Sequence, residues 1–206
     1  EPILLDWRVD SMNKDGFDHY MLKEIHEQPR AILDTLDLIV DRQTGQPKFE
    51  PMREALLRAK RIQILGCGTA YYAGLVGEYI LEAEARIPVE VELASEYRYR
   101  SPIVDKDTVV IAVTQSGETA DTLAAIREAK RLGATTFAIC NVRTSTITRE
   151  AQYTVFTAAG PEIGVASTKA FTTQVLVFMM LWQYLAHLRG LDEKLLFLRL
   201  NATSFI

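Results

Sequence analysis

Apolar and polar positions divide the chain into a helical N-terminal part and a later part in which short apolar runs alternate with helical segments. Over residues 17–41 the apolar positions recur at helical spacing, and Pro29 lies in the middle of this stretch. A proline marks either a break or the first turn of a second helix, so we predict two helices in tandem. A loop over residues 44–49 and a short amphipathic helix over residues 52–60 follow.

Five apolar, strand-like runs come next, at Arg61–Gly66, Val89–Leu93, Thr108–Thr114, Thr135–Cys140 and Tyr153–Thr157. Each run ends in a turn and leads into a helical segment, which is the βαβ rhythm of a parallel sheet. The third run contains the unbroken apolar sequence VVIAV. Such a run is expected where helices cover both faces of a strand, so we predict that it is the central strand of an α/β fold.

The intervening helices have recognisable ends. One is predicted from the turn after residue 66 to about Ala85, and a short one over Glu96–Arg100 has Ser95 as its N-cap. Another runs from Thr119 to about Leu132 and is closed by Gly133, a usual C-terminal residue. The last and longest extends from Lys169 to about Leu188.

Charge and composition narrow the range of partners. The 206 residues carry 23 Lys and Arg against 27 Asp and Glu, a net charge of −4, with no basic stripe. We therefore expect neither nucleic acid nor an anionic membrane surface as a partner, and favour a small polar metabolite. The longest apolar run, Val175–Trp182, has eight residues, far fewer than the roughly 20 that a membrane span needs.

The two cysteines indicate the compartment. Cys67 and Cys140 lie far apart and fit neither a disulfide framework nor a CxxC metal or redox site. We therefore expect a reducing, cytoplasmic location. No signal stretch precedes the first helices and the chain begins with Glu1, so we interpret it as a piece of something longer.

Three turns after predicted strands are rich in glycine and hydroxyl groups: Gly66–Ala70, Thr114–Thr119 and Gly164–Thr168. In a doubly wound sheet, ligands bind at such turns, outside the carboxyl ends of the strands. The second turn supplies donors from Thr114, Gln115, Ser116 and Thr119. Its Gly117 permits close backbone approach, and the following helix start favours an anion. We predict a phosphate site there.

Other interpretations of these turns remain open or are excluded. Simple helix capping explains one hydroxyl group, but not four polar donors around one glycine. A dinucleotide site is disfavoured because Tyr71 occupies the position at which GxGxxG requires its third glycine, and no GK[ST] sequence indicates a P-loop. We expect no cofactor and no metal site.

The candidate acid and base groups are few. Glu118 and Glu162 lie beside the polar turns, and for Glu118 we favour a role as a helix-dipole partner. Lys169 is interpreted as a solvated lysine, with substrate contact as the lesser alternative. The histidines fall on predicted helices away from the strand ends and are interpreted as surface or packing residues: His19, His26 and His187.

Longer motifs allow a family comparison. They are KEIHEQP (23–29), GCGTAYYAG (66–74), ASEYRYR (94–100), QSGETADTL (115–123), ICN (139–141) and GPEIGVASTKAFTTQ (160–174). In this order they closely resemble the glutamine:fructose-6-phosphate aminotransferases, the glucosamine-6-phosphate synthases. The resemblance spans roughly residues 16 to 190 and is to the first of the two sugar isomerase (SIS) subdomains in the isomerase half of those enzymes.

The resemblance implies a fold and a domain plan. The expected fold is an SIS-type three-layer α/β/α sandwich with a five-stranded parallel sheet. The SIS domain would occupy residues 15–190, with N-terminal helices over 17–41 and an α/β core over 52–190. Residues 1–14 would be a linker or tail, and residues 191–206 a C-terminal linker or truncated end.

The resemblance also implies the substrate-binding residues. Those expected around the phosphate of fructose 6-phosphate are Thr69, Thr114, Gln115, Ser116 and Thr119. Val165 and Ser167 would border the sugar. Ala70 belongs to the same site, although many relatives carry serine there, and many also carry serine in place of Thr114. Alanine at position 70 loses the hydroxyl group of that serine, whereas threonine at position 114 keeps one.

In the family, the catalytic base, the ring-opening histidine and the imine-forming lysine belong to the second SIS subdomain and the C-terminal tail. We therefore expect no catalytic residue in this chain and no activity from it alone. The expected partners are fructose 6-phosphate or glucosamine 6-phosphate, a glutaminase domain, the second SIS subdomain and a second copy in a homodimer. The alternatives are a sugar-phosphate-sensing SIS module of a transcriptional regulator, which would adjoin a helix-turn-helix, and a stand-alone isomerase, which would need its own base and histidine near the strand ends.

Overall fold

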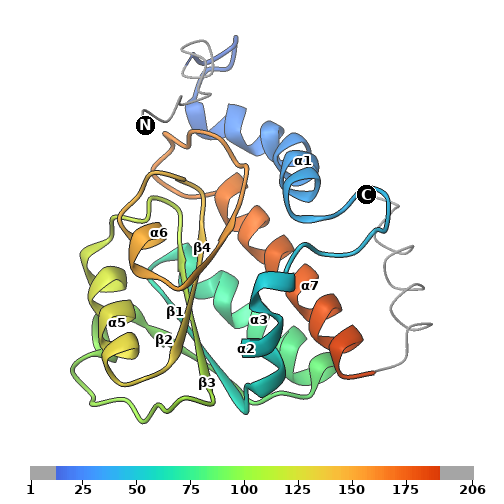
Figure 1. Cartoon of the computed structure of the whole chain (residues 1–206). Helices are drawn as coiled ribbons and strands as arrows, with labels where there is room; N and C mark the ends of the chain where they lie inside the picture. Colours follow the sequence, from blue (N-terminus) through green and yellow to red (C-terminus); the bar gives the residue numbers. More distant parts are fainter. Residues whose placement is uncertain (1–12, 191–206) are drawn as a thin grey trace.

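A parallel sheet of five strands lies at the centre of the computed structural model, which describes residues 13–190 (Figure 1). Its strands are β1 (Arg61–Gly66), β2 (Val89–Leu93), β3 (Thr108–Thr114), β4 (Thr135–Cys140) and β5 (Tyr153–Phe156). The order across the sheet is β2-β1-β3-β4-β5, and every neighbouring pair is parallel. The prediction of an α/β fold with the third strand at its centre is confirmed.

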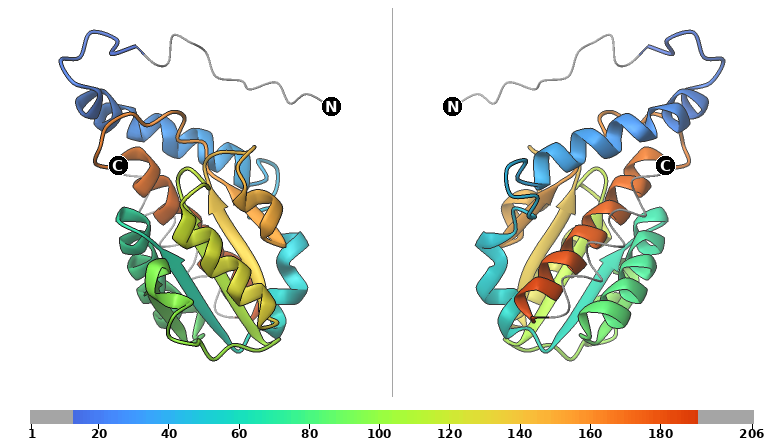
Figure 2. Two further views of the ribbon diagram at one scale, coloured as in Figure 1. Left: turned by 90° about the vertical axis from the view of Figure 1, so that its left-hand side faces the viewer. Right: turned by 90° about the vertical axis from the view of Figure 1, so that its right-hand side faces the viewer.

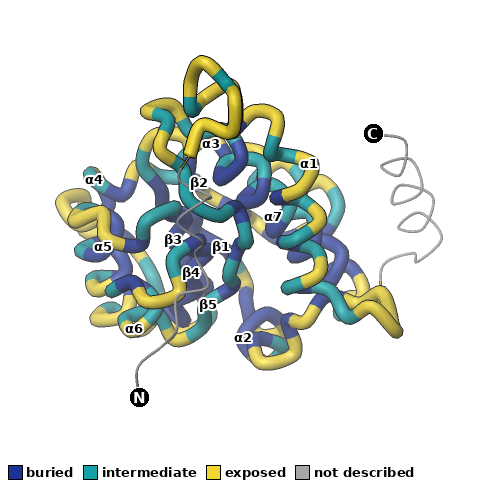
Figure 3. Tube along the Cα trace, turned by 90° about the horizontal axis from the view of Figure 1, so that it is seen from above, coloured by how far each residue is buried: buried dark blue, intermediate teal, exposed yellow. Residues whose placement is uncertain are grey.

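The side chains of β3 alternate between two hydrophobic cores, one on each face of the sheet. Val109, Ile111 and Val113 join a core with α2 (Arg53–Arg58), α3 (Thr69–Ala85) and α7 (Lys169–Leu188). Val110 and Ala112 join the core formed with α4 (Ala94–Tyr97), α5 (Ala120–Arg131) and α6 (Ile147–Glu150). The period of two along a strand thus produces the three-layer sandwich, with the buried strands between the two helical layers (Figure 3).

The N-terminal helical stretch is one helix, α1 (Tyr20–Ile39), and the prediction of two tandem helices is wrong. Pro29 lies inside it and lacks the N–H that would bond to the carbonyl group of Ile25. The side-chain amide of Gln28 donates to that carbonyl at 3.2 Å. This bond gives the Ile25 carbonyl group a donor, and the helix, which packs against α7 and β5, continues through the proline.

Three short elements also differ from expectation. The helix predicted to begin after Ser95 begins at Ala94, directly after β2, so Ser95 lies within its first turn and its hydroxyl group bonds Glu96 instead of capping. A 3-10 turn, η2 (Glu50–Met52), leads into α2, which is shorter than predicted. The single-turn helix α6 has no counterpart in the prediction.

Helix α1 lies across the edge of the sheet at which the strands end, beside the segment that leads from β5 to α7 (Figure 2). It packs against both β5 and α7. This position places α1 next to the turns that the sequence singles out. Within residues 13–190, no helix has the length and apolar composition required to cross a membrane.

Candidate functional site

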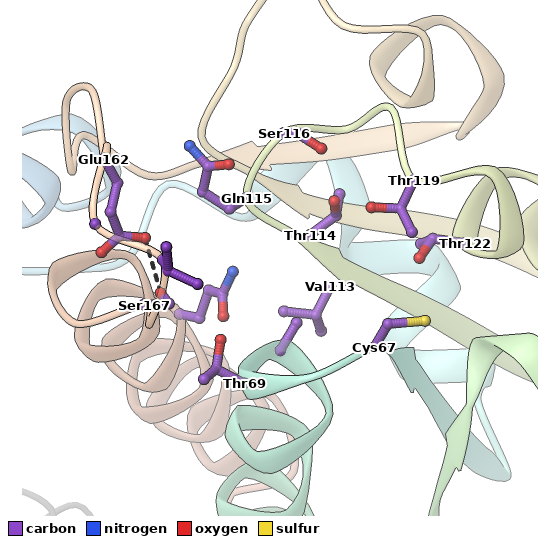
Figure 4. A pocket seen from close by; sticks show the side chains of 14 residues that line it. Cys67, Thr69, Val113, Thr114, Gln115, Ser116, Thr119, Thr122, Glu162 and Ser167 are labelled. Atoms are coloured by element: carbon purple, nitrogen blue, oxygen red, sulfur yellow. Dashed lines mark hydrogen bonds between the residues drawn. The ribbon is translucent and has the colours of Figure 1, made fainter.

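A cavity of ≈ 240 Å³ opens where β1 and β3 end, and the predicted site residues lie together around it (Figure 4). All eight line the cavity: Thr69, Ala70, Thr114, Gln115, Ser116, Thr119, Val165 and Ser167. The other lining residues are Cys67, Val113, Thr122, Glu162, Gly164 and Gln174. Among these, Thr122 and Gln174 lie inside helices at positions that a periodic pattern assigns to the core, so no local signal identified them.

The turn after β3 is held by its own hydroxyl groups. The Gly117 N–H donates to Thr114 Oγ1 at 3.1 Å, and the Glu118 N–H donates to Ser116 Oγ at 3.2 Å. Each hydroxyl oxygen thus accepts a backbone bond, which leaves its hydrogen to donate elsewhere. Gly117 has φ +68, so the tight turn requires its left-handed conformation.

Helix capping does not explain Thr119. It is the N-cap residue of α5, yet its side chain makes no capping hydrogen bond. Figure 4 shows the Thr119 hydroxyl group beside Thr114 and Ser116, at the cavity. The N-terminus of α5 therefore keeps unpaired backbone donors, and its flanking hydroxyl group adds to them.

No lysine or arginine lines the cavity, so its positive potential comes from helix dipoles and N–H groups, whereas Glu162 contributes one carboxylate on the side of the third turn. Helix α3 begins at Thr69 and α5 at Ala120, so both direct their positive ends toward this edge of the sheet. Beneath the turn, burial raises the pKa of the Cys140 thiol, which keeps it neutral. The arrangement suits a small anion held by N–H and O–H groups.

Glu162 organises the third polar turn. Its carboxylate accepts bonds from Ser167 Oγ at 2.8 Å, from the Thr168 N–H at 2.8 Å and from the Ala170 N–H at 3.2 Å. These contacts cap the start of α7 and fix Ser167 at the cavity. Because Ser167 donates to Glu162, its oxygen remains an acceptor for a ligand hydroxyl group.

Helix α1 holds the same turn from the other side. The buried carboxylate of Glu24 accepts from the N–H groups of Ile163 and Gly164. Next to it, Lys169 Nζ lies 2.6 Å from Glu27 Oε2. Lys169 is buried, so its interpretation as a solvated lysine is wrong, and it does not line the cavity. Helix α1 covers this lysine and supplies the carboxylate that compensates its charge.

The remaining acid and base candidates do not line the cavity. Glu118 is exposed and accepts from the Thr146 N–H at 2.7 Å, a bond that lowers the pKa of the Glu118 carboxyl group and ties the turn to the start of α6. None of the three histidines lines the cavity. His26 stacks on Phe17 with ring centroids 5.3 Å apart, a packing role. Within residues 13–190, no group of His, Cys, Asp and Glu side chains is arranged to hold a metal ion.

The fold is that of an α/β protein, and its candidate ligand site is a cavity formed by hydroxyl-rich turns at the carboxyl ends of parallel strands. A family model described as "SIS domain" matches residues 55–183. The chain therefore belongs to the SIS domain family, as the motifs predict.

Relatives within this family include the glutamine–fructose-6-phosphate aminotransferase (isomerizing) of Clostridium tetani, which is 52% identical over 190 residues. The match covers 91% of this chain and 31% of that protein, so the chain spans about a third of the length of the curated relatives it matches. The solved C-terminal domain of the glucosamine-fructose-6-phosphate aminotransferase from Francisella tularensis is 42% identical, with a TM-score of 0.82. That match covers 86% of this chain and 50% of the solved one.

The sugar isomerase domain of an RpiR transcription factor from Sphaerobacter thermophilus has the same fold, with a TM-score of 0.65. Its identity is 18%, with 81% of this chain and 89% of that chain covered, so the likeness is one of fold alone. The much higher identities to the aminotransferases favour that branch of the family over the regulator alternative.

Proposed function

We propose that this chain is the sugar-phosphate-binding SIS domain of a glucosamine-6-phosphate synthase and that it binds fructose 6-phosphate or its product, glucosamine 6-phosphate. The parent enzyme would convert fructose 6-phosphate and glutamine to glucosamine 6-phosphate and glutamate. The observation that carries this proposal is the convergence of three hydroxyl-rich turns on one cavity at the carboxyl edge of the sheet. The similarity to glutamine–fructose-6-phosphate aminotransferases supports the choice of ligand.

The two sides of the cavity suit the two parts of such a ligand. The turn containing Ser116 and Thr119 offers hydroxyl and N–H donors without a carboxylate, which favours a phosphate dianion. Figure 4 shows Ser167 and Glu162 across the cavity from Thr119. Their oxygens would accept hydrogen bonds from the hydroxyl groups of a sugar. Val165 lies at this end of the cavity and is fully exposed in this chain. It would contact the sugar when a neighbouring domain closes over this end of the cavity.

In the parent enzyme the chain would supply binding, while catalytic groups come from elsewhere. We propose that a second SIS subdomain and a glutaminase domain complete the enzyme, in a cytoplasmic homodimer without nucleic-acid or membrane partners. Exposed apolar side chains on α3, at Tyr72, Val76 and Tyr79, support a surface that another domain or copy covers. The unpaired thiols of Cys67 and Cys140 support a reducing compartment.

Calorimetric titration of the chain with fructose 6-phosphate, fructose and a nucleotide tests the proposal. We expect binding of the sugar phosphate and little or none of the other two. A chain that binds only the nucleotide would contradict the proposal.

The substitution Ser116→Ala should weaken fructose 6-phosphate binding about tenfold or more, since a hydrogen bond to a charged oxygen contributes roughly 1.5 to 3 kcal/mol. The melting temperature of the free protein should hardly change, because the removed hydroxyl group supports only a local turn bond. Ser95→Ala is the matched control, a partly exposed serine outside the cavity. If Ser116→Ala bound fructose 6-phosphate as tightly as the wild type, Ser116 would not contact the ligand and would serve only to hold its turn.

A further inference from the structure

Helix α7 carries a buried amide whose carbonyl oxygen has no hydrogen-bond partner. Within residues 13–190, two buried side-chain atoms lack a partner, Thr168 Oγ1 and Gln174 Oε1. Of these two residues, only Gln174 lines the cavity, and it is 3% exposed. Burying a polar group that makes no hydrogen bond is unfavourable, so a buried glutamine in this state calls for an explanation.

Two other buried amides in the same fold, those of Gln63 and Asn141, are paired on both their oxygen and their nitrogen. Gln63 accepts from the Tyr97 hydroxyl group at 3.2 Å and donates to Glu90 at 2.9 Å. Asn141 donates to the Gly160 carbonyl at 2.9 Å and accepts from the Ala159 N–H at the same distance. Gln174 differs from Gln63 and Asn141 in two ways. Its carbonyl oxygen makes no hydrogen bond, and its side chain lines the cavity.

The place of Gln174 indicates which part of a ligand it meets. It lies in the second turn of α7, the helix whose start is fixed by Glu162 beside Ser167. In Figure 4, Ser167 lies on the side of the cavity opposite Thr119 and Thr122. Thr69, which the resemblance assigns to the phosphate, also lies on the Ser167 side. Because Gln174 is on α7, the helix that begins directly after Ser167 and Thr168, we infer that it meets a ligand at the Ser167 end of the cavity.

The amide group also has the right chemistry for that end. A sugar hydroxyl group both donates and accepts, so it can pair with either atom of a glutamine amide. A phosphate oxygen only accepts, and it would leave the carbonyl oxygen of Gln174 without a donor.

We propose that the amide of Gln174 hydrogen-bonds a hydroxyl group of the bound sugar phosphate and so contributes to selecting a sugar phosphate over inorganic phosphate. This inference rests on the proposed function of the cavity. It explains why a buried carbonyl oxygen has no partner within the protein, because the ligand supplies the missing donor.

The substitution Gln174→Met tests the proposal. Methionine has a similar length and an unbranched shape, so it fills the same space without the amide. We expect the affinity for fructose 6-phosphate to fall about tenfold, the loss of one hydrogen bond, with the affinity for inorganic phosphate unchanged. The melting temperature of the free chain should stay the same or rise, because an unpaired polar group is removed. Gln183→Met is the matched control, a buried glutamine on the same helix outside the cavity.

The measurements are calorimetric titration with fructose 6-phosphate and competition of that binding by inorganic phosphate, on the 206-residue chain. Equal affinities of the wild type and Gln174→Met for fructose 6-phosphate would overturn this inference alone. Equal losses for both ligands would also overturn it, since they would move Gln174 to the phosphate end. A wild-type chain that binds no fructose 6-phosphate would overturn the proposed function and this inference together. Should the methionine variant fail to fold, Gln174→Asn, which withdraws the amide by one methylene, should show the same pattern.

Discussion

Replacing Gly117 by alanine is expected to lower the free energy of unfolding by about 3 kcal/mol or more. Gly117 has φ +68, which costs an alanine of the order of 1 kcal/mol or more. The added Cβ would lie 2.6 Å from Ser145 Cβ and 2.9 Å from Cys140 Sγ, both buried beneath the turn. Overpacking of this kind costs roughly 1 to 3 kcal/mol further. Binding of fructose 6-phosphate should be lost as the turn is displaced.

Denaturant titration measures these free energies of unfolding, and Gly133→Ala separates the cost of the positive φ from the cost of overpacking. Gly133 has φ +95, but an added Cβ would meet nothing within 4 Å, so only the backbone cost of about 1 to 2 kcal/mol applies. Ligand affinity should stay unchanged because Gly133 lies outside the cavity. Equal destabilisation by the two substitutions would show that the turn relaxes freely, contrary to a rigid phosphate site.

The second large effect is expected for Glu24→Ala. This change removes the buried carboxylate that accepts from the N–H groups of Ile163 and Gly164. Two part-buried N–H groups then lose their charged acceptor, and a hydrogen bond to a charged group contributes roughly 1.5 to 3 kcal/mol. We expect unfolding free energy to fall by about 2 to 4 kcal/mol and fructose 6-phosphate affinity to fall more than tenfold, because the turn bearing Val165 and Ser167 loses its support.

Glu24→Gln keeps one carbonyl oxygen as an acceptor. Its unfolding free energy and its affinity for fructose 6-phosphate should both lie between those of the wild type and Glu24→Ala. Glu54→Ala, at an exposed glutamate on α2, controls for the general loss of a carboxylate and should change neither. Ligand affinity that is unaffected by Glu24→Ala would mean that the segment between β5 and α7 does not contribute to the site.

The strands and the polar turns are predictable because their signals are local. An apolar run such as VVIAV specifies a strand covered on both faces, and the sequence TQSGET combines a glycine with the hydroxyl groups that the turn uses. The position of these turns at one edge then follows from the parallel arrangement. For this reason all eight predicted site residues line one cavity.

The differences arise where distant residues decide the outcome. Lys169 has the sequence context of a surface residue, but Glu27, 142 positions earlier, pairs with it on the helix that covers it. Gln174 has the spacing of a core position on α7, and only the packed structure reveals that it reaches the cavity with an unpaired oxygen. Helix α1 continues through Pro29 and packs against α7 and β5, tertiary contacts that the local propensity at Pro29 does not include.

The most direct measurement of the central claim is a crystal structure of the chain grown with saturating fructose 6-phosphate. We predict that the phosphate lies in the turn after β3, within hydrogen-bonding distance of Ser116 and Thr119, with the sugar directed toward Ser167. A sugar phosphate in the opposite orientation, or one bound outside this cavity at full occupancy, would contradict this prediction.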